Sequence, residues 1–109
     1  MEIAFDTKDL RTLIETDRAL QSKFGPLYIQ VKSKISDLIA IEKVNELLPE
    51  TFTVVSFKSI ECIRVTNLNG DFEIIFCSNH IKVPAKTNGD TDWSKVKRIK
   101  ILEIVQINA

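Results

Sequence analysis

The sequence has 109 residues, of which 44% are hydrophobic and 28% are charged, a composition typical of globular proteins. A chain of this length is predicted to form one domain, residues 1–109, with a buried core. Fifteen basic and fifteen acidic residues cancel, which argues against a protein that binds nucleic acid mainly through its net charge.

No segment predicts a membrane or secreted protein. No apolar run approaches the ~20 residues of a membrane span, and Asp6, Lys8 and Asp9 interrupt the opening stretch too early for a signal peptide. Two cysteines are typical of a reducing cytosol. We therefore expect a cytoplasmic protein without a membrane partner.

The beginning of the chain predicts a strand followed by a helix. Residues 1–5 alternate weakly and end at Asp6 and Thr7, either of which can cap a helix. Leucine and isoleucine then recur at helical spacing. A second cap at Thr16 or Asp17 predicts a break in this helix.

A second helix is expected after Gly25-Pro26. Proline is tolerated in a first helical turn, where its missing N–H would have no partner. The apolar side chains that follow lie on one helical stripe: Leu27, Tyr28, Val31, Ile35, Leu38 and Ile39. The two helical runs form an αα-hairpin or one kinked helix, and either arrangement has to cover an apolar sheet face.

The stretch from Ile60 to Cys77 predicts a β-hairpin. Two strand-like runs flank Asn69-Gly70, which favours a two-residue type I′ turn because both central residues of that turn need φ > 0. This turn fixes four facing pairs: Leu68 with Asp71, Val65 with Ile74, Ile63 with Phe76 and Cys62 with Cys77.

The alternation of side chains divides the hairpin between two faces. One face is apolar and consists of Ile63, Val65, Phe72, Ile74 and Phe76. The other is mixed and consists of Cys62, Arg64, Thr66, Glu73, Ile75 and Cys77. The apolar face has to be core, whereas the mixed face, with its diagonal Arg64/Glu73 pair, suits contact with solvent or a partner.

The remaining segments complete the pattern. Residues 42–48 predict a helical turn, and the β-branched and aromatic residues at 52–57 predict a strand. Residues 80–92 predict a loop, 92–95 a further helical turn and 97–107 a final strand. The order is typical of an α+β protein with helices on one face of a largely antiparallel sheet.

No strong catalytic motif is present. The three glycines are scattered, so no phosphate-binding glycine loop exists, and no G-x-S-x-G element occurs. One histidine and two cysteines outside a C-x-x-C motif argue against a zinc site. We expect no cofactor.

Three features have both a structural and a functional interpretation. Cys62 and Cys77 face each other closely enough for a disulfide; we favour two reduced thiols, with a redox switch as the alternative. His80 is either polar surface or an acid–base group near neutral pH. Trp93 either fastens its loop by burying its ring or stacks on a base.

A basic cluster leads into the final strand and consists of Lys95, Lys97, Arg98 and Lys100. On a strand, Arg98 and Lys100 share one face, which is normal where one face meets solvent. The alternative is an RNA phosphate site that also uses Arg64 and Lys58.

Four segments carry a resemblance to a known family. They are Met1–Phe5 with Lys8-Asp9-Leu10; Lys23-Phe24-Gly25 before a helix ending in Leu38-Ile39-Ala40; Leu68–Phe76; and Asp92–Val96 with Arg98-Ile99 and Ile101–Ile104. The third is similar to a family hairpin of the form L-D-G-x-Y-R-L-I-F. Together they resemble the RelE/ParE superfamily of toxins from type II toxin–antitoxin systems, specifically the HigB-like branch, some members of which are labelled killer suppression proteins.

The resemblance implies a RelE-like fold, with an N-terminal strand and two helices packed on one face of a mostly antiparallel four- to five-stranded sheet. It also implies a cognate antitoxin, often a helix-turn-helix protein. Many relatives cut mRNA on the ribosome, and ParE-type relatives target gyrase. In the RNA-cutting relatives, basic residues on the open sheet face stabilise the phosphate while an acid or base assists attack by the 2′-OH.

This sequence departs from that catalytic pattern. Glu73 stands where the family strand has arginine, and Gln106-Ile107-Asn108 stands in place of a D-Y-H ending. The candidate catalytic residues are therefore Arg64, Lys58, Glu73 and His80.

Two hypotheses follow. The chain is either a toxin that cleaves mRNA with a rearranged set of polar groups, or a module of the same fold that is catalytically inactive or targets a protein, and acts by binding. Both predict a small antitoxin partner, and the first adds the ribosome and mRNA.

Overall fold

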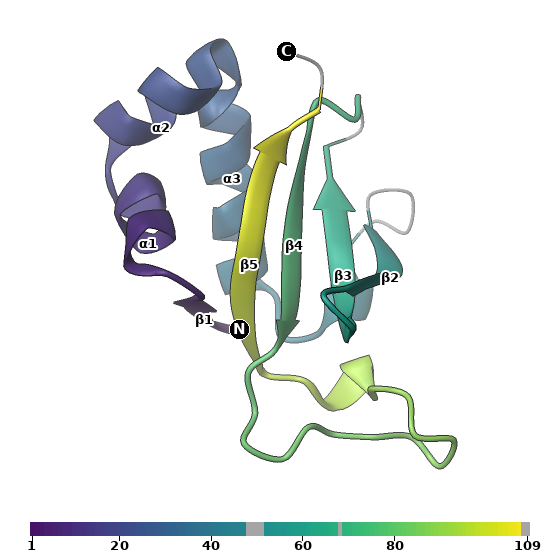
Figure 1. Cartoon of the computed structure of the whole chain (residues 1–109). Coiled ribbons are helices and arrows are strands. Elements are labelled where there is room, and N and C mark those ends of the chain that lie inside the picture. The colour runs from purple at the N-terminus through teal and green to yellow at the C-terminus, as the bar shows by residue number, and fades with distance from the viewer. Residues whose placement is uncertain (48–51, 68, 108–109) are drawn as a thin grey trace.

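The computed structural model of this chain describes residues 1–47, 52–67 and 69–107. Its five-stranded sheet has the order β1-β5-β4-β3-β2 (Figure 1). The strands are β1 (Glu2–Phe5), β2 (Phe52–Phe57), β3 (Ile60–Thr66), β4 (Phe72–Ser78) and β5 (Arg98–Gln106). β1 runs parallel to β5 and the other pairs are antiparallel, so the predicted, mostly antiparallel sheet is confirmed.

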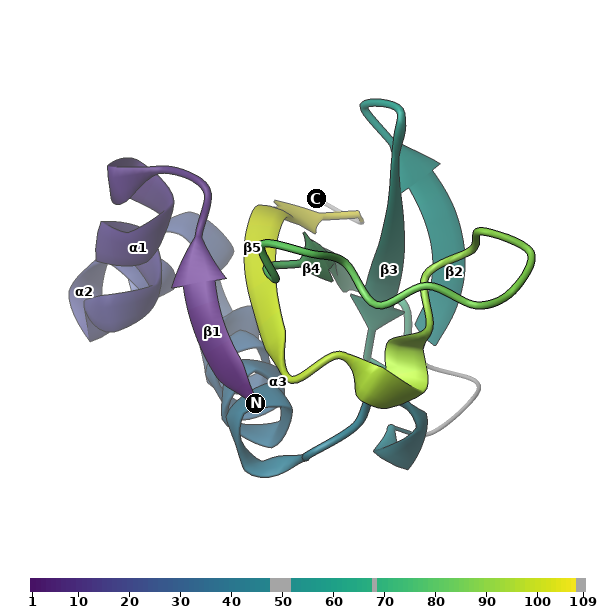
Figure 2. The same cartoon turned by 90° about the horizontal axis from the view of Figure 1, so that it is seen from below.

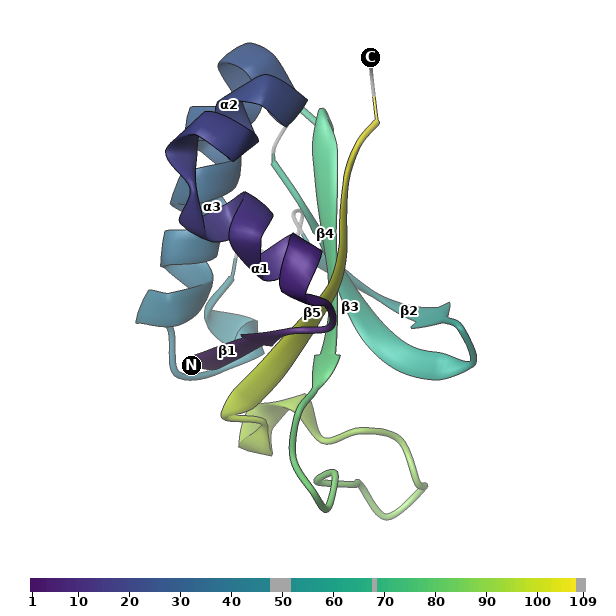
Figure 3. The same cartoon turned by 60° about the vertical axis from the view of Figure 1, so that its left-hand side comes forward.

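The α-helices pack on one side of this sheet, as Figure 3 shows. The helices are α1 (Lys8–Glu15), α2 (Asp17–Phe24) and α3 (Tyr28–Ala40), and the short 3₁₀ turns are η1 (Gly25–Leu27), η2 (Val44–Glu46) and η4 (Trp93–Lys95). The α+β class is therefore confirmed. The first of the two predicted helical runs is divided into α1 and α2.

Local sequence explains where these helices begin and end. The Thr7 side chain accepts a hydrogen bond from the Leu10 N–H at 3.1 Å, which pairs a donor of the first helical turn. Thr16 is extended, with φ −118° and ψ 110°, and separates α1 from α2. The predicted break is confirmed, but the Thr16 side chain makes no capping hydrogen bond. Gly25, with φ 56°, ends α2, and Pro26 lies in the turn that leads into α3.

The core lies between the helices and one sheet face. Its helical side includes Leu20, Phe24, Val31, Ile35 and Leu38, and its sheet side includes Ile63, Val65, Phe72, Ile74, Phe76, Ile99, Ile101 and Ile104. All five side chains of the predicted apolar hairpin face are at most 1% exposed, which confirms that this face points inward. Each such burial contributes about 1.5–3 kcal/mol.

The hairpin formed by β3 and β4 has the predicted register. Ile63 pairs with Phe76 and Val65 pairs with Ile74. Because side chains alternate along a strand, this register places the whole apolar set on the helix side.

The bend of the hairpin differs from the predicted type I′ turn. Gly70 has φ 70°, but Asn69 is not among the described residues with a positive φ. The Gly70 N–H donates to the Asn67 carbonyl at 3.0 Å, and the Asp71 N–H donates to Asn67 Oδ1 at 2.7 Å. Asn67 thus stabilises a different turn, and the predicted Leu68 pair lies outside the described residues.

A two-residue turn with two positive φ angles occurs between β2 and β3 instead. Phe57 pairs with Ile60, and the intervening Lys58 and Ser59 have φ 52° and 66°. A type I′ turn requires positive φ at both positions, and left-handed geometry costs roughly 1–2 kcal/mol for each residue other than glycine. Neither lysine nor serine is a typical signal for this turn, so sequence reasoning missed it.

The mixed face of the hairpin is more buried than predicted. Cys62, Ile75 and Cys77 are at most 6% exposed, and they pack with Val55, Phe57 and Leu102. Figure 3 shows β2 and β3 curving away from the helices, which is the strong twist expected of a two-stranded ribbon. The curvature brings Val55 and Phe57 against this face, so only part of it meets solvent.

The strained turn gives a stability prediction. Ser59→Gly should raise the free energy of unfolding by about 0.5–1 kcal/mol, because glycine adopts positive φ without the Cβ penalty. Urea unfolding measures the change. The matched control is Ser33→Gly in α3, which should lower stability by about 0.5 kcal/mol because glycine is a poor helix former. Destabilisation by Ser59→Gly would contradict the turn geometry.

Candidate functional site

Two of the four candidate catalytic residues form a pair. Arg64 on β3 lies opposite Ile75, and Glu73 on β4 lies opposite Thr66, so the two polar residues are diagonal neighbours. Arg64 Nε is 3.6 Å from Glu73 Oε2, and the two side chains are 44% and 22% exposed. The predicted Arg64/Glu73 pair is therefore confirmed. At this exposure the pair contributes at most about 1 kcal/mol to stability.

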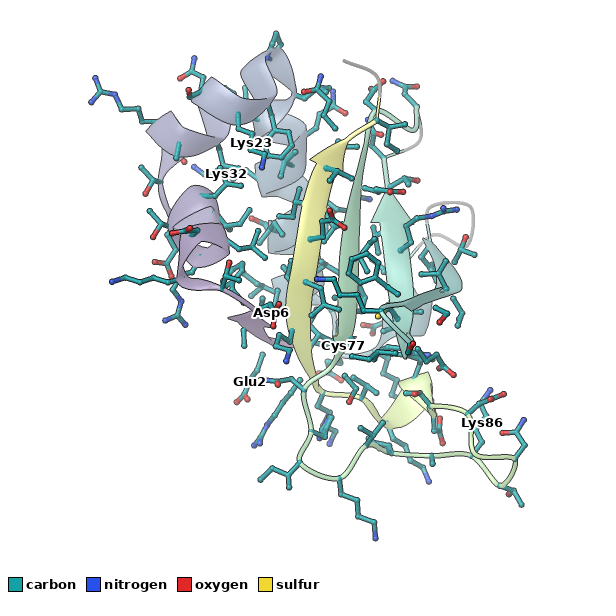
Figure 4. The ribbon with its side chains drawn as sticks, viewed as in Figure 1. Glu2, Asp6, Lys23, Lys32, Cys77 and Lys86 are labelled. Atoms are coloured by element: carbon teal, nitrogen blue, oxygen red, sulfur yellow. The ribbon has the colours of Figure 1, made fainter. Side chains whose placement is uncertain are left out.

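The other basic side chains on the same sheet face are also paired with acids. Arg98 Nε lies 3.0 Å from Glu2 Oε2, and Lys100 Nζ lies 3.7 Å from Asp6 Oδ1. Figure 4 shows Glu2 and Asp6 beside the lower half of β5. The two acids come from β1 and its end, where Glu2 is in register with Arg98. We call the helix-free side of the sheet the open face.

Lys58 and His80 lie at the opposite end of the sheet from Arg64 and Glu73. Lys58 is in the β2–β3 turn, with its ammonium 5.4 Å from the centre of the Phe57 ring. His80 follows the end of β4, whereas Glu73 lies near its start. Roughly 16 Å of extended strand therefore separates Glu73 from the end of β4. The four candidates do not form one site.

His80 holds the ends of a long loop together. Its Nε2 accepts a hydrogen bond from the Lys97 N–H at 3.0 Å. This bond joins the first part of the loop of residues 79–97 to its last residue, directly before β5. Because Nε2 acts as an acceptor, His80 in this geometry is occupied by a structural contact.

Trp93 fastens the same loop to the sheet. Its Nε1–H donates to Glu61 Oε2 at 2.8 Å, and its ring meets Phe76 edge to face, with centroids 6.1 Å apart. Figure 2 shows the loop crossing below the sheet toward β2 and returning through η4. The predicted fastening role is confirmed. Glu61 was missed as its partner, since an acid in a strand gives no sign of a distant indole.

The two cysteines are free and buried, so there is no disulfide. Burial, followed by the neighbouring Cys77, raises the pKa of Cys62 to about 11. Burial also raises the pKa of Cys77, while Lys100 acts in the opposite direction. Both thiols are therefore protonated at neutral pH and poorly nucleophilic.

Other classes of site have no support in the described part of the chain. Residues 1–47, 52–67 and 69–107 contain no group of three or more His, Cys, Asp or Glu side chains arranged to hold a metal ion. The same residues form no helix with the length and hydrophobicity that a membrane span requires.

Comparisons with known proteins give no relative from which a role could be transferred. No family model, no curated protein and no solved structure matches this chain. The geometry of the open face therefore has to carry the functional argument.

The buried thiols give a reactivity prediction. At pH 8, a thiol with a pKa of about 11 is ionised about a hundredfold less than one with the ordinary value of 9.0. Native Cys62 should therefore react with Ellman's reagent at least about a hundredfold more slowly than in the chain unfolded in guanidinium. A Cys77→Ala variant isolates this thiol.

The same pKa sets the sign of a stability change. The unfolded chain loses the Cys62 proton near pH 9, whereas the folded chain keeps it until about pH 11. Stability should consequently fall as the pH rises from 9 to 11, and a Cys62→Ala variant should lose this part of the slope. In the labelling experiment above, a native Cys62 that reacted with Ellman's reagent at pH 8 as fast as in the unfolded chain would contradict a buried, protonated thiol.

Proposed function

We propose that this chain is the toxin component of a type II toxin–antitoxin system, with a RelE/HigB-like fold, and that it acts by binding a protein target. The sequence resemblance motivates the toxin assignment. An N-terminal strand, with helices on one face of a five-stranded, mostly antiparallel sheet, agrees with the arrangement that this resemblance implies.

One observation favours binding over RNA cleavage: every basic side chain of β3 and β5 on the open face lies beside a carboxylate. An RNA phosphate that bound one of these basic groups would meet its acidic partner, which is Glu73, Glu2 or Asp6. Even if the phosphate displaced that carboxylate, an acid would still face the RNA. Guanidinium and ammonium groups stabilise phosphate best where their charge is not already compensated. An open face of balanced charge is better suited to a protein.

The separation of the other candidates supports the same conclusion. General acid–base catalysis needs the acid or base within hydrogen-bond reach of the reacting group. His80 lies beyond the far end of β4, bonded to the Lys97 N–H, and Lys58 lies in the β2–β3 turn. Neither is positioned beside the Arg64/Glu73 pair.

A cognate antitoxin remains part of the proposal. A small protein encoded beside this gene should bind this chain and neutralise it. We expect this antitoxin to carry a helix-turn-helix domain. Co-expression and size-exclusion chromatography test this partner directly.

A ribosome-dependent mRNA endoribonuclease is the second candidate. Its support is the Arg64/Glu73 pair itself, which is partly exposed and places a guanidinium within 3.6 Å of a carboxylate. In such a site Arg64 would hold the phosphate and Glu73 would accept the 2′-OH proton.

Induced expression in bacterial cells separates the two candidates. The binding proposal predicts growth arrest with full-length mRNA, measured by mapping RNA 5′ ends after induction. Arg64→Ala should leave the mRNA full-length, and the exposed helical control Arg11→Ala should do the same. These outcomes follow because the proposed action does not use Arg64 as a phosphate ligand.

Other outcomes have defined meanings. The binding proposal would be overturned in favour of cleavage if the original chain shortened mRNA and Arg64→Ala lowered the number of cleaved 5′ ends by at least about tenfold. Normal growth at high levels of folded protein, in cells without the neighbouring gene, would overturn the toxin assignment itself.

A further inference from the structure

The outer edge of β5 is only half covered. β4 pairs with this strand from Ile99 to Gln106, with a register shift at Leu102, but on the opposite side β1 pairs only with Arg98–Ile101. The last backbone bond on that side joins the Asp6 N–H to the Ile101 carbonyl at 2.9 Å. The chain then turns into α1, and no strand in the described part of the structure pairs with the outer edge of residues 102–105.

A groove of about 440 Å³ runs along this uncovered edge. Its walls include Asp9, Leu10 and Leu13 of α1, Lys23 of α2 and Glu103 of β5. Figure 1 shows α1 and α2 alongside the upper half of β5, beyond the end of β1. We call this feature the β5 groove.

The β5 groove combines a free strand edge with an apolar wall. Backbone N–H and C=O groups along an uncovered edge need hydrogen-bond partners, and an added strand supplies them. Leu10 and Leu13 of α1 are partly buried and pack against the core, so they offer apolar surface beside that edge. An extended backbone with alternating side chains fits both features.

The charged side chains in the walls of the β5 groove indicate which charge a bound peptide should carry. Asp9 and Glu103 are acidic and Lys23 is basic, and none of the three belongs to an ion pair within the described residues. Lys23 extends from α2, with its ammonium 5.9 Å from the centre of the Phe24 ring (Figure 4). The groove walls therefore carry one net negative charge.

We propose that the β5 groove binds an extended peptide segment of a partner protein, which adds to β5 as a further strand in line with β1. Its apolar side chains face Leu10 and Leu13, and a basic side chain faces Asp9 and Glu103. The contact spans about 13 Å of strand, so a short linear segment is sufficient. This inference does not depend on the toxin assignment, because it requires only the strand edge and its walls.

Peptide selection on the full-length chain tests the proposal. A phage-displayed library of random octapeptides is selected on the immobilised protein, and the most enriched sequence is synthesised and titrated by fluorescence anisotropy. Enriched sequences should alternate apolar residues and include lysine or arginine. Bound peptide should slow amide hydrogen exchange at residues 102–105.

Backbone methylation distinguishes strand addition from other binding. N-methylation at two alternate residues, whose N–H groups point toward β5, should weaken binding at least about tenfold, because each removes a hydrogen bond. Methylation at the intervening residues, whose N–H groups point away, should have little effect. Equal effects of the two patterns would overturn strand addition.

A charge-reversed variant locates the site. Glu103→Lys should weaken binding about fivefold or more, whereas Glu42→Lys, at an exposed position outside the groove, should leave it unchanged. Failure to enrich any peptide, or equal affinities for both variants together with unchanged exchange at residues 102–105, would overturn the proposal.

Discussion

The pairing of β3 with β4 is the constraint on which the rest of the structure depends. Ile63 opposite Phe76 and Val65 opposite Ile74 place a continuous apolar surface against the helices. Because side chains alternate, a shift of one residue would turn this surface toward the opposite side and bury charged groups. The helices, the position of β5 and the polar groups of the open face all follow from this register.

The same alternation explains why the open face is electrically balanced. It places Arg64 diagonally across from Glu73, and the parallel pairing of β1 with β5 brings Glu2 to Arg98. Charges that neutralise one another in this way contribute little to stability, but they remove the strong positive field that RNA-binding surfaces use. A protein-binding role therefore agrees better with this surface than phosphate recognition does.

Much of the fold could be predicted from local patterns. Strand alternation predicted the apolar hairpin face and the Arg64/Glu73 pair, and a capping residue predicted the break at Thr16. Other features have no local signal. Lys58 and Ser59 adopt positive φ without any glycine or asparagine to indicate it, and the burial of Cys62 arises from the curvature of β2 and β3, a consequence of twist rather than of residue type.

The sequence by itself determined the α+β class, the hairpin register and the identity of the core, because hydrophobic periodicity directly reflects which side of an element is buried. Only the tertiary structure decided which polar groups meet. It separated His80 and Lys58 from Arg64, joined Trp93 to Glu61, and left the outer edge of residues 102–105 uncovered by β1. These outcomes depend on distances between segments remote in sequence, which the spacing of residues along the chain does not encode.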